Sequence, residues 1–131
     1  MFECLKDLGI TEEKFNEIAE MNIYLECMDE DDIKGPIHFL RDFGCSDIKI
    51  RNIIISDPFF LSRTVTDLVK TVKKLEEVGL KKEDISELMD GYPYILENDD
   101  FEIDEYVKRK VAEGMSLDEI CDRIYDNPME I

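Results

Sequence analysis

The hydrophobic residues between positions 65 and 78 recur at the spacing of an α-helix. They are separated by three or four residues, which places their side chains on one face of the helix. That face consists of Val65, Leu68, Val72, Leu75 and Val78. Gly79 follows directly, where a helix can end in a left-handed C-cap that glycine adopts without steric cost. The pattern therefore predicts a helix over residues 65–78 that packs this face against a core.

A second amphipathic helix is predicted over about residues 82–90, with Ile85, Leu88 and Met89 facing inward. Pro93 ends this helix, because the residue before a proline is displaced from the α-helical region. The segment PYIL at residues 93–96 then predicts a short turn that places hydrophobic side chains under the helices. One unit thus consists of a helix, a glycine, a second helix and a proline turn.

This frame of leucine, glycine, proline and leucine recurs along the chain at an interval of 35 residues. The recurring positions hold Gly9, Gly44, Gly79 and Gly114, and Pro58, Pro93 and Pro128. Because glycine and proline have backbone roles that other residues replace poorly, their common phase indicates a repeated structural unit. In the first unit Ile23 occupies the proline position, so the helix there is predicted to continue to about Met28.

The other units follow the same pattern. Helices over about residues 35–43 and 101–113 precede their glycines, and Ser116 with Glu119 forms a capping box for the last helix. Thr11 and Ser46 are the predicted caps in the first two units. The core residues predicted for these helices are Phe15, Ile18, Ala19, Ile50, Ile53, Ile54, Ile120 and Ile124. The units cover about residues 1–28, 34–61, 65–96 and 101–131 of a single helical-repeat domain.

Acidic residues dominate the charge of the chain. The sequence holds 33 acidic and 16 basic residues, which gives a formal net charge of −17. Such a charge repels phosphate backbones and anionic membrane surfaces. No apolar run approaches the roughly 20 residues that span a bilayer. The first residues lack the apolar region of a signal peptide, so we expect a cytoplasmic protein. We also expect that it does not bind membranes and that it is monomeric rather than homo-oligomeric.

Two acidic segments, residues 28–32 and 97–104, fall between the predicted units. We interpret them as solvated linkers in which an Asp or Asn caps the next helix. Neither follows the 12-residue ligand order, with its central glycine, that a calcium-binding loop requires. The sequence therefore predicts no calcium site.

Candidate catalytic and metal-binding residues are few. His38 is the only histidine, and its apolar surroundings indicate a packed helix residue. None of the four cysteines forms a pair with zinc-ligand spacing, which favours ordinary reduced thiols, and Cys45 and Cys121 fall within helical apolar patterns. No glycine-rich phosphate loop occurs. The sequence predicts a protein that is not an enzyme and that has no cofactor.

The repeat frame resembles that of a known family. Gly44, Gly79 and Gly114 are each followed after six residues by an isoleucine (Ile50, Ile85 and Ile120), whereas the first unit has Phe15 there. P-x-x-L then follows in the second and third units, with Ile131 in place of the leucine in the last. This combination resembles the helical repeats of the mitochondrial transcription termination factor (mTERF) family. The resemblance implies an all-α fold, a right-handed solenoid of helix pairs with 35-residue repeats. In the family the inner groove is basic and binds nucleic acid, often in organelles. This chain departs from the family because it is acidic and shows no transit peptide, and no functional residue carries over.

Two classes of function remain open. The first is a binding module for a protein with a basic surface, because solenoids present extended surfaces and acidic faces attract basic partners. The candidate partner-binding residues are Asp29, Glu30, Asp31, Asp32, Asp99 and Asp100. A narrower form of this hypothesis is a nucleic-acid mimic that inhibits a DNA- or RNA-handling enzyme, of the anti-restriction or anti-CRISPR type.

The second class is nucleic-acid binding of the mTERF type in transcription regulation. Its support is the nearly neutral segment 36–70, which holds five basic and four acidic residues. The candidate contacts are Arg41, Lys49, Arg51, Arg63 and Lys70, and residues 108–110 form a smaller basic cluster. This function requires the basic side chains to converge on one groove.

Overall fold

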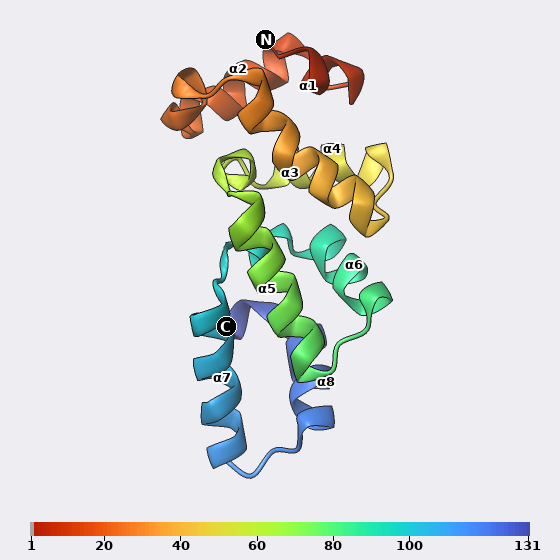
Figure 1. Ribbon diagram of the computed structural model, residues 1–131, viewed down its shortest axis with the longest axis vertical. Coiled ribbons are helices and arrows are strands. Elements are labelled where there is room, and N and C mark those ends of the chain that lie inside the picture. The colour runs from red at the N-terminus through yellow and green to blue at the C-terminus, as the bar shows by residue number, and fades with distance from the viewer. Residues whose placement is uncertain (1) are drawn as a thin grey trace. The chain divides into compact units, whose positions relative to one another are not determined.

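A computed structural model describes residues 2–131, and α-helices alternate there with short 3₁₀ helices (Figure 1). No strand occurs in this part of the chain. The prediction of an all-α fold is confirmed. The chain divides into two compact units, Met1–Val65 and Thr66–Ile131. Each unit holds two of the predicted repeats.

The helices follow one another in the order that the repeat predicts. The first unit contains α1 (Glu3–Asp7), α2 (Glu12–Met21), the 3₁₀ helix η1 (Ile23–Cys27), α3 (Glu30–Phe43), α4 (Asp47–Ser56) and η2 (Phe60–Ser62). The later elements are α5 (Val65–Val78), α6 (Lys82–Gly91), η3 (Pro93–Glu97), α7 (Asp100–Ala112), α8 (Leu117–Asp126) and η4 (Pro128–Glu130). Each repeat thus ends in a 3₁₀ helix at the proline position, as the sequence frame predicts for a turn.

The predicted ends of the helices are confirmed at both the glycines and the caps. The four glycines of the repeat all have positive φ, and Gly79 has the largest value, +124°. Only glycine adopts such a conformation without strain. The side chains of Thr11, Ser46 and Ser116 accept hydrogen bonds from backbone N–H groups three residues later, each at 3.2 Å. These contacts satisfy donors that a helix N-terminus otherwise leaves unpaired.

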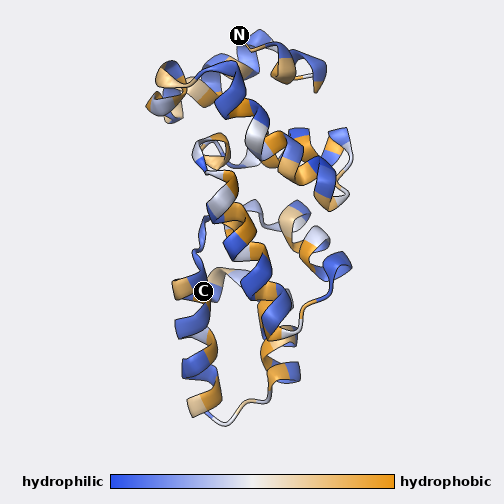
Figure 2. Cartoon of the chain, viewed as in Figure 1, coloured by the Kyte–Doolittle hydropathy of each residue, from blue (hydrophilic) through white to orange (hydrophobic). Residues whose placement is uncertain are grey.

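Most residues that were predicted to face a core are buried. Hydrophobic and hydrophilic residues alternate along the helices (Figure 2), as expected when one face of each helix is packed. The buried residues include Ile18, Ile50, Ile53, Ile54, Leu68, Val72, Leu75, Val78, Ile85, Leu88, Met89, Ile120 and Ile124. Val65 is an exception at 40% exposure, because it is the first residue of α5 and has no preceding helical turn to cover. Phe15 and Ala19 are half-buried.

The predicted continuation of the helix in the first unit to about Met28 is wrong. α2 ends at Met21, and Asn22 leaves the helical region with φ −118° and ψ 91°. The Asn22 Oδ1 atom accepts a hydrogen bond of 3.1 Å from the backbone N–H of Tyr24, which fixes the start of η1. An asparagine side chain, one residue before the position where the other repeats have a proline, thereby stops the helix.

The predicted start of the helix in the second unit is also wrong. α3 begins at Glu30 rather than near Gly35, because Asp29 and Asp32 form a capping box. Gly35 and Pro36 disfavour a helix interior, but the cap and the full burial of Ile33 stabilise the longer helix. The acidic segment 28–32 is therefore a cap and a first helical turn, not a linker. Only its predicted capping role is confirmed.

His38 is exposed, which contradicts its prediction as a packed residue. The buried face of α3 carries Ile33, Pro36, Ile37 and Leu40, at the spacing of one helix face. His38 follows Ile37 directly and projects away from that face. The apolar sequence around His38 thus reflects its neighbours and not its own environment.

Candidate functional site

The acidic candidates of the first unit are used to build α3. The Asp29 carboxylate accepts a hydrogen bond of 2.9 Å from the backbone N–H of Asp32, and the Asp32 carboxylate accepts one of 3.1 Å from the backbone N–H of Asp29. The Glu30 carboxylate accepts a bond of 3.0 Å from the backbone N–H of Cys4. Asp31 lines a polar recess that Asp32 and Arg63 share. Carboxylates at this end also interact favourably with the helix dipole.

The acidic candidates of the second unit have a similar position. Asp99 is the N-cap of α7 and accepts a hydrogen bond of 2.7 Å from the backbone N–H of Glu102. Asp100 is the first residue of that helix. Asp29 and Asp99 stand two repeat intervals apart in sequence, so the repeat itself accounts for an acidic cap at both places. The segment 97–104 thus contains the end of η3, the two linking residues Asn98 and Asp99, and the first turn of α7. The predicted capping role is confirmed, and the linker is shorter than predicted.

Replacing Asp29 by alanine is expected to lower the free energy of unfolding by about 1 kcal/mol, because the cap of α3 is lost. Asparagine at the same position retains the acceptor oxygen and should preserve most of the stability. Asp31→Ala is the matched control, since Asp31 neighbours the cap without forming it. Urea unfolding of the three variants measures the difference. Equal stability of Asp29→Ala and Asp31→Ala would contradict a structural role for Asp29.

The basic candidates of the first unit lie at separate places. Arg41, in the last turn of α3, pairs with Asp47 at 3.2 Å between Nε and Oδ1. Arg63 lies in the polar recess at the other end of α3. The guanidinium group of Arg51 lies against Gly9, where an added Cβ would be 3.2 Å from Nη1. Lys49 is in the first turn of α4.

Lys70 belongs to α5 in the second unit. The smaller basic cluster in α7 is neutralised locally. Lys108 pairs with Asp104 at 3.1 Å, and Lys110 pairs with Glu113 at 3.2 Å. The Arg109 guanidinium lies 5.7 Å from the centre of the Tyr106 ring. These contacts fit solvated helix faces better than a groove for phosphate groups.

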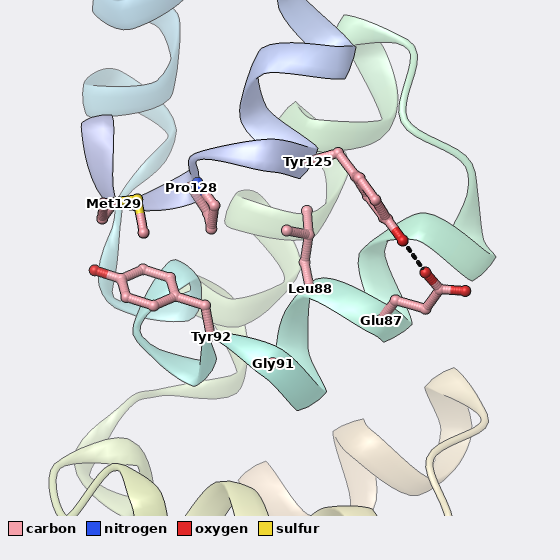
Figure 3. Close-up of a pocket in the computed structure, with 7 residues that line it drawn as sticks. All are labelled: Glu87, Leu88, Gly91, Tyr92, Tyr125, Pro128 and Met129. Atoms are coloured by element: carbon pink, nitrogen blue, oxygen red, sulfur yellow. Dashed lines mark hydrogen bonds between the residues drawn. The ribbon is translucent and has the colours of Figure 1, made fainter.

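An apolar recess in the second unit is a candidate site that sequence reasoning did not identify (Figure 3). The recess has a volume of about 330 Å³. Its lining residues are Glu87, Leu88, Gly91 and Tyr92 from α6 and its C-cap, Tyr125 from α8, and Pro128 and Met129 from η4. Residues from two successive repeats therefore form its two walls.

Gly91 keeps this recess open. A Cβ atom added at Gly91 would have no heavy atom within 4 Å, so no side chain occupies the space above it. The corresponding positions of the other repeats hold Met21, Ser56 and Asp126. Gly91 lies outside the repeated glycine positions and does not have a positive φ, so the backbone does not require a glycine there. A glycine at this position is the sequence signal that could have indicated the recess.

One end of the recess is polar. The Tyr125 hydroxyl donates a hydrogen bond to the Glu87 carboxylate (Figure 3), which raises the pKa of Tyr125 above its ordinary value. At the other end Tyr92 packs against Tyr94, with their ring centres 5.7 Å apart. Met129 remains 61% exposed. A visiting apolar side chain could therefore contact Leu88, Tyr92 and Met129 while its polar neighbours face the carboxylate.

The two helices beside the recess are strongly acidic. Their carboxylates are Glu83, Asp84, Glu87 and Asp90 in α6, and Asp118, Glu119, Asp122 and Asp126 in α8. Their basic residues are Lys82 and Arg123. Glu130 binds Arg123 through two hydrogen bonds of 2.9 and 3.0 Å, which hold the pKa of the Glu130 carboxyl below its usual range. The helices beside the recess thus attract cations.

Other classes of site are not seen in residues 2–131. No three His, Cys, Asp or Glu side chains of this part of the chain gather as metal ligands. None of its helices is long and apolar enough to cross a bilayer. The four cysteines are thiols rather than disulfides: Cys45 is buried between α3 and α4, and Cys121 is half-buried in α8. Burial and a hydrogen bond with Glu30 raise the pKa of Cys4 to about 11.

Comparison with known proteins identifies the family. No curated protein matches the chain. The family model described as mTERF matches residues 1–131, the whole length of the chain. The match agrees with the paired helices, the repeated left-handed glycines and the 3₁₀ turns of both units. The protein therefore belongs to the mTERF family of helical-repeat proteins.

Proposed function

We propose that this mTERF-family chain is a non-enzymatic binding module for a protein partner with a basic surface. The supporting observation is the apolar recess of the second unit, which Glu87 lines and which lies between the acidic helices α6 and α8. In this proposal the recess accepts an apolar side chain of the partner, and the flanking carboxylates bind lysine or arginine residues beside it. A single well-enclosed anchor of this kind often supplies most of the affinity of an interface.

The charge of the surrounding helices supports a basic partner over a neutral one. α6 and α8 carry the eight carboxylates named above, so they attract a basic segment over a distance set by the ionic strength. The acidic caps Asp29 and Asp99 contribute to the overall field, although their oxygens bind backbone N–H groups. Attraction between charges provides no apolar contact with the partner, and the recess supplies that contact. Shape and charge therefore favour the same class of partner.

Nucleic-acid binding is the second candidate, because the family is of the nucleic-acid-binding type. Arg51, Arg63 and Lys70 support it, since they form no ion pair within residues 2–131. The net charge of −17 opposes it. The mimic hypothesis requires carboxylates that are free to imitate phosphates. Asp29, Asp32 and Asp99 are less suited to that role because they cap helices.

Gly91→Leu is expected to weaken binding of a basic, apolar peptide by about tenfold or more, because the new side chain fills the recess. The probe is a fluorescein-labelled peptide with leucines flanked by lysines, and its affinity is measured by fluorescence anisotropy at physiological salt. Gly91→Ala is the matched control, since one methyl group leaves most of the recess open. A peptide with serine in place of leucine measures the contribution of charge alone.

The same assay with labelled duplex DNA and single-stranded RNA decides between the two candidates. We expect no binding of either nucleic acid at low or at physiological salt. Nucleic-acid binding that weakens steeply with salt, and is lost in Arg51→Ala or Arg63→Ala, would support the family function instead. Equal affinity and an equal number of bound peptides for the wild type and for Gly91→Leu would refute the recess as a site.

A further inference from the structure

One position of the repeat exposes a large hydrophobic side chain every time. It lies directly after the proline position and holds Tyr24, Phe59, Tyr94 and Met129. Their exposed fractions are 64%, 44%, 39% and 61%. The next residue in three of the repeats, Leu25, Phe60 or Ile95, is at most 2% exposed and belongs to the core. Core packing therefore explains the buried neighbour but does not account for a large hydrophobic side chain at the exposed position.

In the second unit this position belongs to the recess. Met129 lines the recess, and the Tyr94 ring packs against Tyr92, which also lines it. The contacting 3₁₀ helices η3 and η4 carry the two exposed residues. The repeated position thus serves the proposed partner site in that unit.

The first unit exposes the corresponding residues on a similar pair of turns. η1 and η2 contact one another, and the buried Asn22 side chain joins them by donating hydrogen bonds to the Pro58 carbonyl at 3.0 Å and to Ser62 Oγ at 2.6 Å. Tyr24 lies on η1 and Phe59 directly precedes η2. Met21 and Ile23, at the end of α2 and the start of η1, are 65% and 70% exposed. These four residues form what we call the first-unit apolar surface: Met21, Ile23, Tyr24 and Phe59.

The charge beside this surface matches that of the recess. Residues 12–27 hold five carboxylates and one basic residue, Lys14, which pairs with Glu17 at 2.8 Å. A second copy of the chain is a poor occupant, because each copy carries a net charge of −17. A basic polypeptide with apolar side chains fits both the charge and the exposed hydrophobic area.

We propose that the first-unit apolar surface is a second docking site for the same class of basic, apolar segment. This inference rests on the proposed function and extends it, because one chain then binds two such segments. Each unit supplies its own site, formed at the same position of the repeat. Binding a partner that carries two segments would gain from the linkage between them.

Isothermal titration calorimetry with the lysine–leucine peptide tests this proposal through stoichiometry. We expect two peptides per wild-type chain and one peptide per chain after the double substitution Tyr24→Ser and Phe59→Ser. Gly91→Leu should also leave one site, namely the first-unit apolar surface. Ile48→Ser is the matched control, because Ile48 is 63% exposed on α4 but lies outside the repeated position. Since all the substituted side chains are exposed, circular dichroism should show unchanged helix content.

Each outcome separates the two proposals. One site in the wild type that Gly91→Leu removes, with no effect of the Tyr24 and Phe59 substitutions, would overturn the second site and keep the recess. No peptide binding by the wild type would overturn both. An equal loss of a site in Ile48→Ser would also overturn the inference, because any exposed apolar residue would then suffice.

Discussion

Replacing Gly79 by valine is expected to lower the free energy of unfolding by about 3 kcal/mol, the largest effect predicted for this chain. Gly79 has φ +124°, a conformation in which a β-branched residue is strained. A Cβ atom at this position would also lie 3.2 Å from the Cys121 Sγ atom of α8, so the Cys121 side chain would have to move by a few tenths of an ångström. Backbone strain and the close approach of two helices therefore act together.

Two control substitutions separate these causes. Gly91→Val should change the stability by no more than about 0.5 kcal/mol, because valine is tolerated in a helix at least as well as glycine. Gly91 also has no atom within 4 Å of an added Cβ. Gly44→Val retains the strain, at φ +107°, without the steric contact, and should be intermediate. Urea unfolding followed by circular dichroism gives all three values. Equal losses for Gly79→Val and Gly91→Val would contradict the C-cap.

Much of the fold could be predicted because the repeat is marked by residues with special backbones. The predicted bounds of α5, residues 65–78, agree with the structure, since Gly79 ends a helix whose apolar period is unbroken. Ser46 and Ser116 mark the starts of α4 and α8 equally clearly. At these positions local propensity, capping and burial all favour the same boundary.

The wrong boundaries arose where side-chain hydrogen bonds outweighed backbone propensity. Gly35 and Pro36 indicated a helix start, but the capping box of Asp29 and Asp32 extends α3 by a turn and a half before them. At Ile23 the missing proline indicated a continuous helix, but Asn22 ends it. A sequence pattern does not show which polar side chain finds its partner across two repeats.

The candidate site was harder to predict than the fold. The recess combines Gly91 with Tyr125 and Met129, which come from successive repeats and meet only in the folded chain. Composition identified the acidic character but not the use of each carboxylate, since Asp29 and Asp99 are caps whereas Glu87 faces the recess. In the proposed function, net charge indicates the class of partner, and packing decides where that partner would insert a side chain.

Asn22→Ala is expected to lower the free energy of unfolding by about 2 to 3 kcal/mol, because it removes three hydrogen bonds at a fully buried position. The substitution leaves the Tyr24 N–H and the buried Pro58 carbonyl without these partners. Asn22→Asp retains the acceptor for Tyr24 but has no N–H group to donate to Pro58, so it should be at least as destabilising.

Ser62→Ala is the control for this prediction, because it removes only the hydrogen bond of 2.6 Å from Asn22 Nδ2 and should cost about 1 kcal/mol. Thermal and urea unfolding of the three variants give the comparison. If Asn22→Ala lowers the free energy of unfolding by no more than Ser62→Ala does, the hydrogen bond from Asn22 to the Pro58 carbonyl does not hold the two turns together. The larger loss would show instead that one buried asparagine replaces the proline of the repeat and also joins η1 to η2, the turns that present Tyr24 and Phe59.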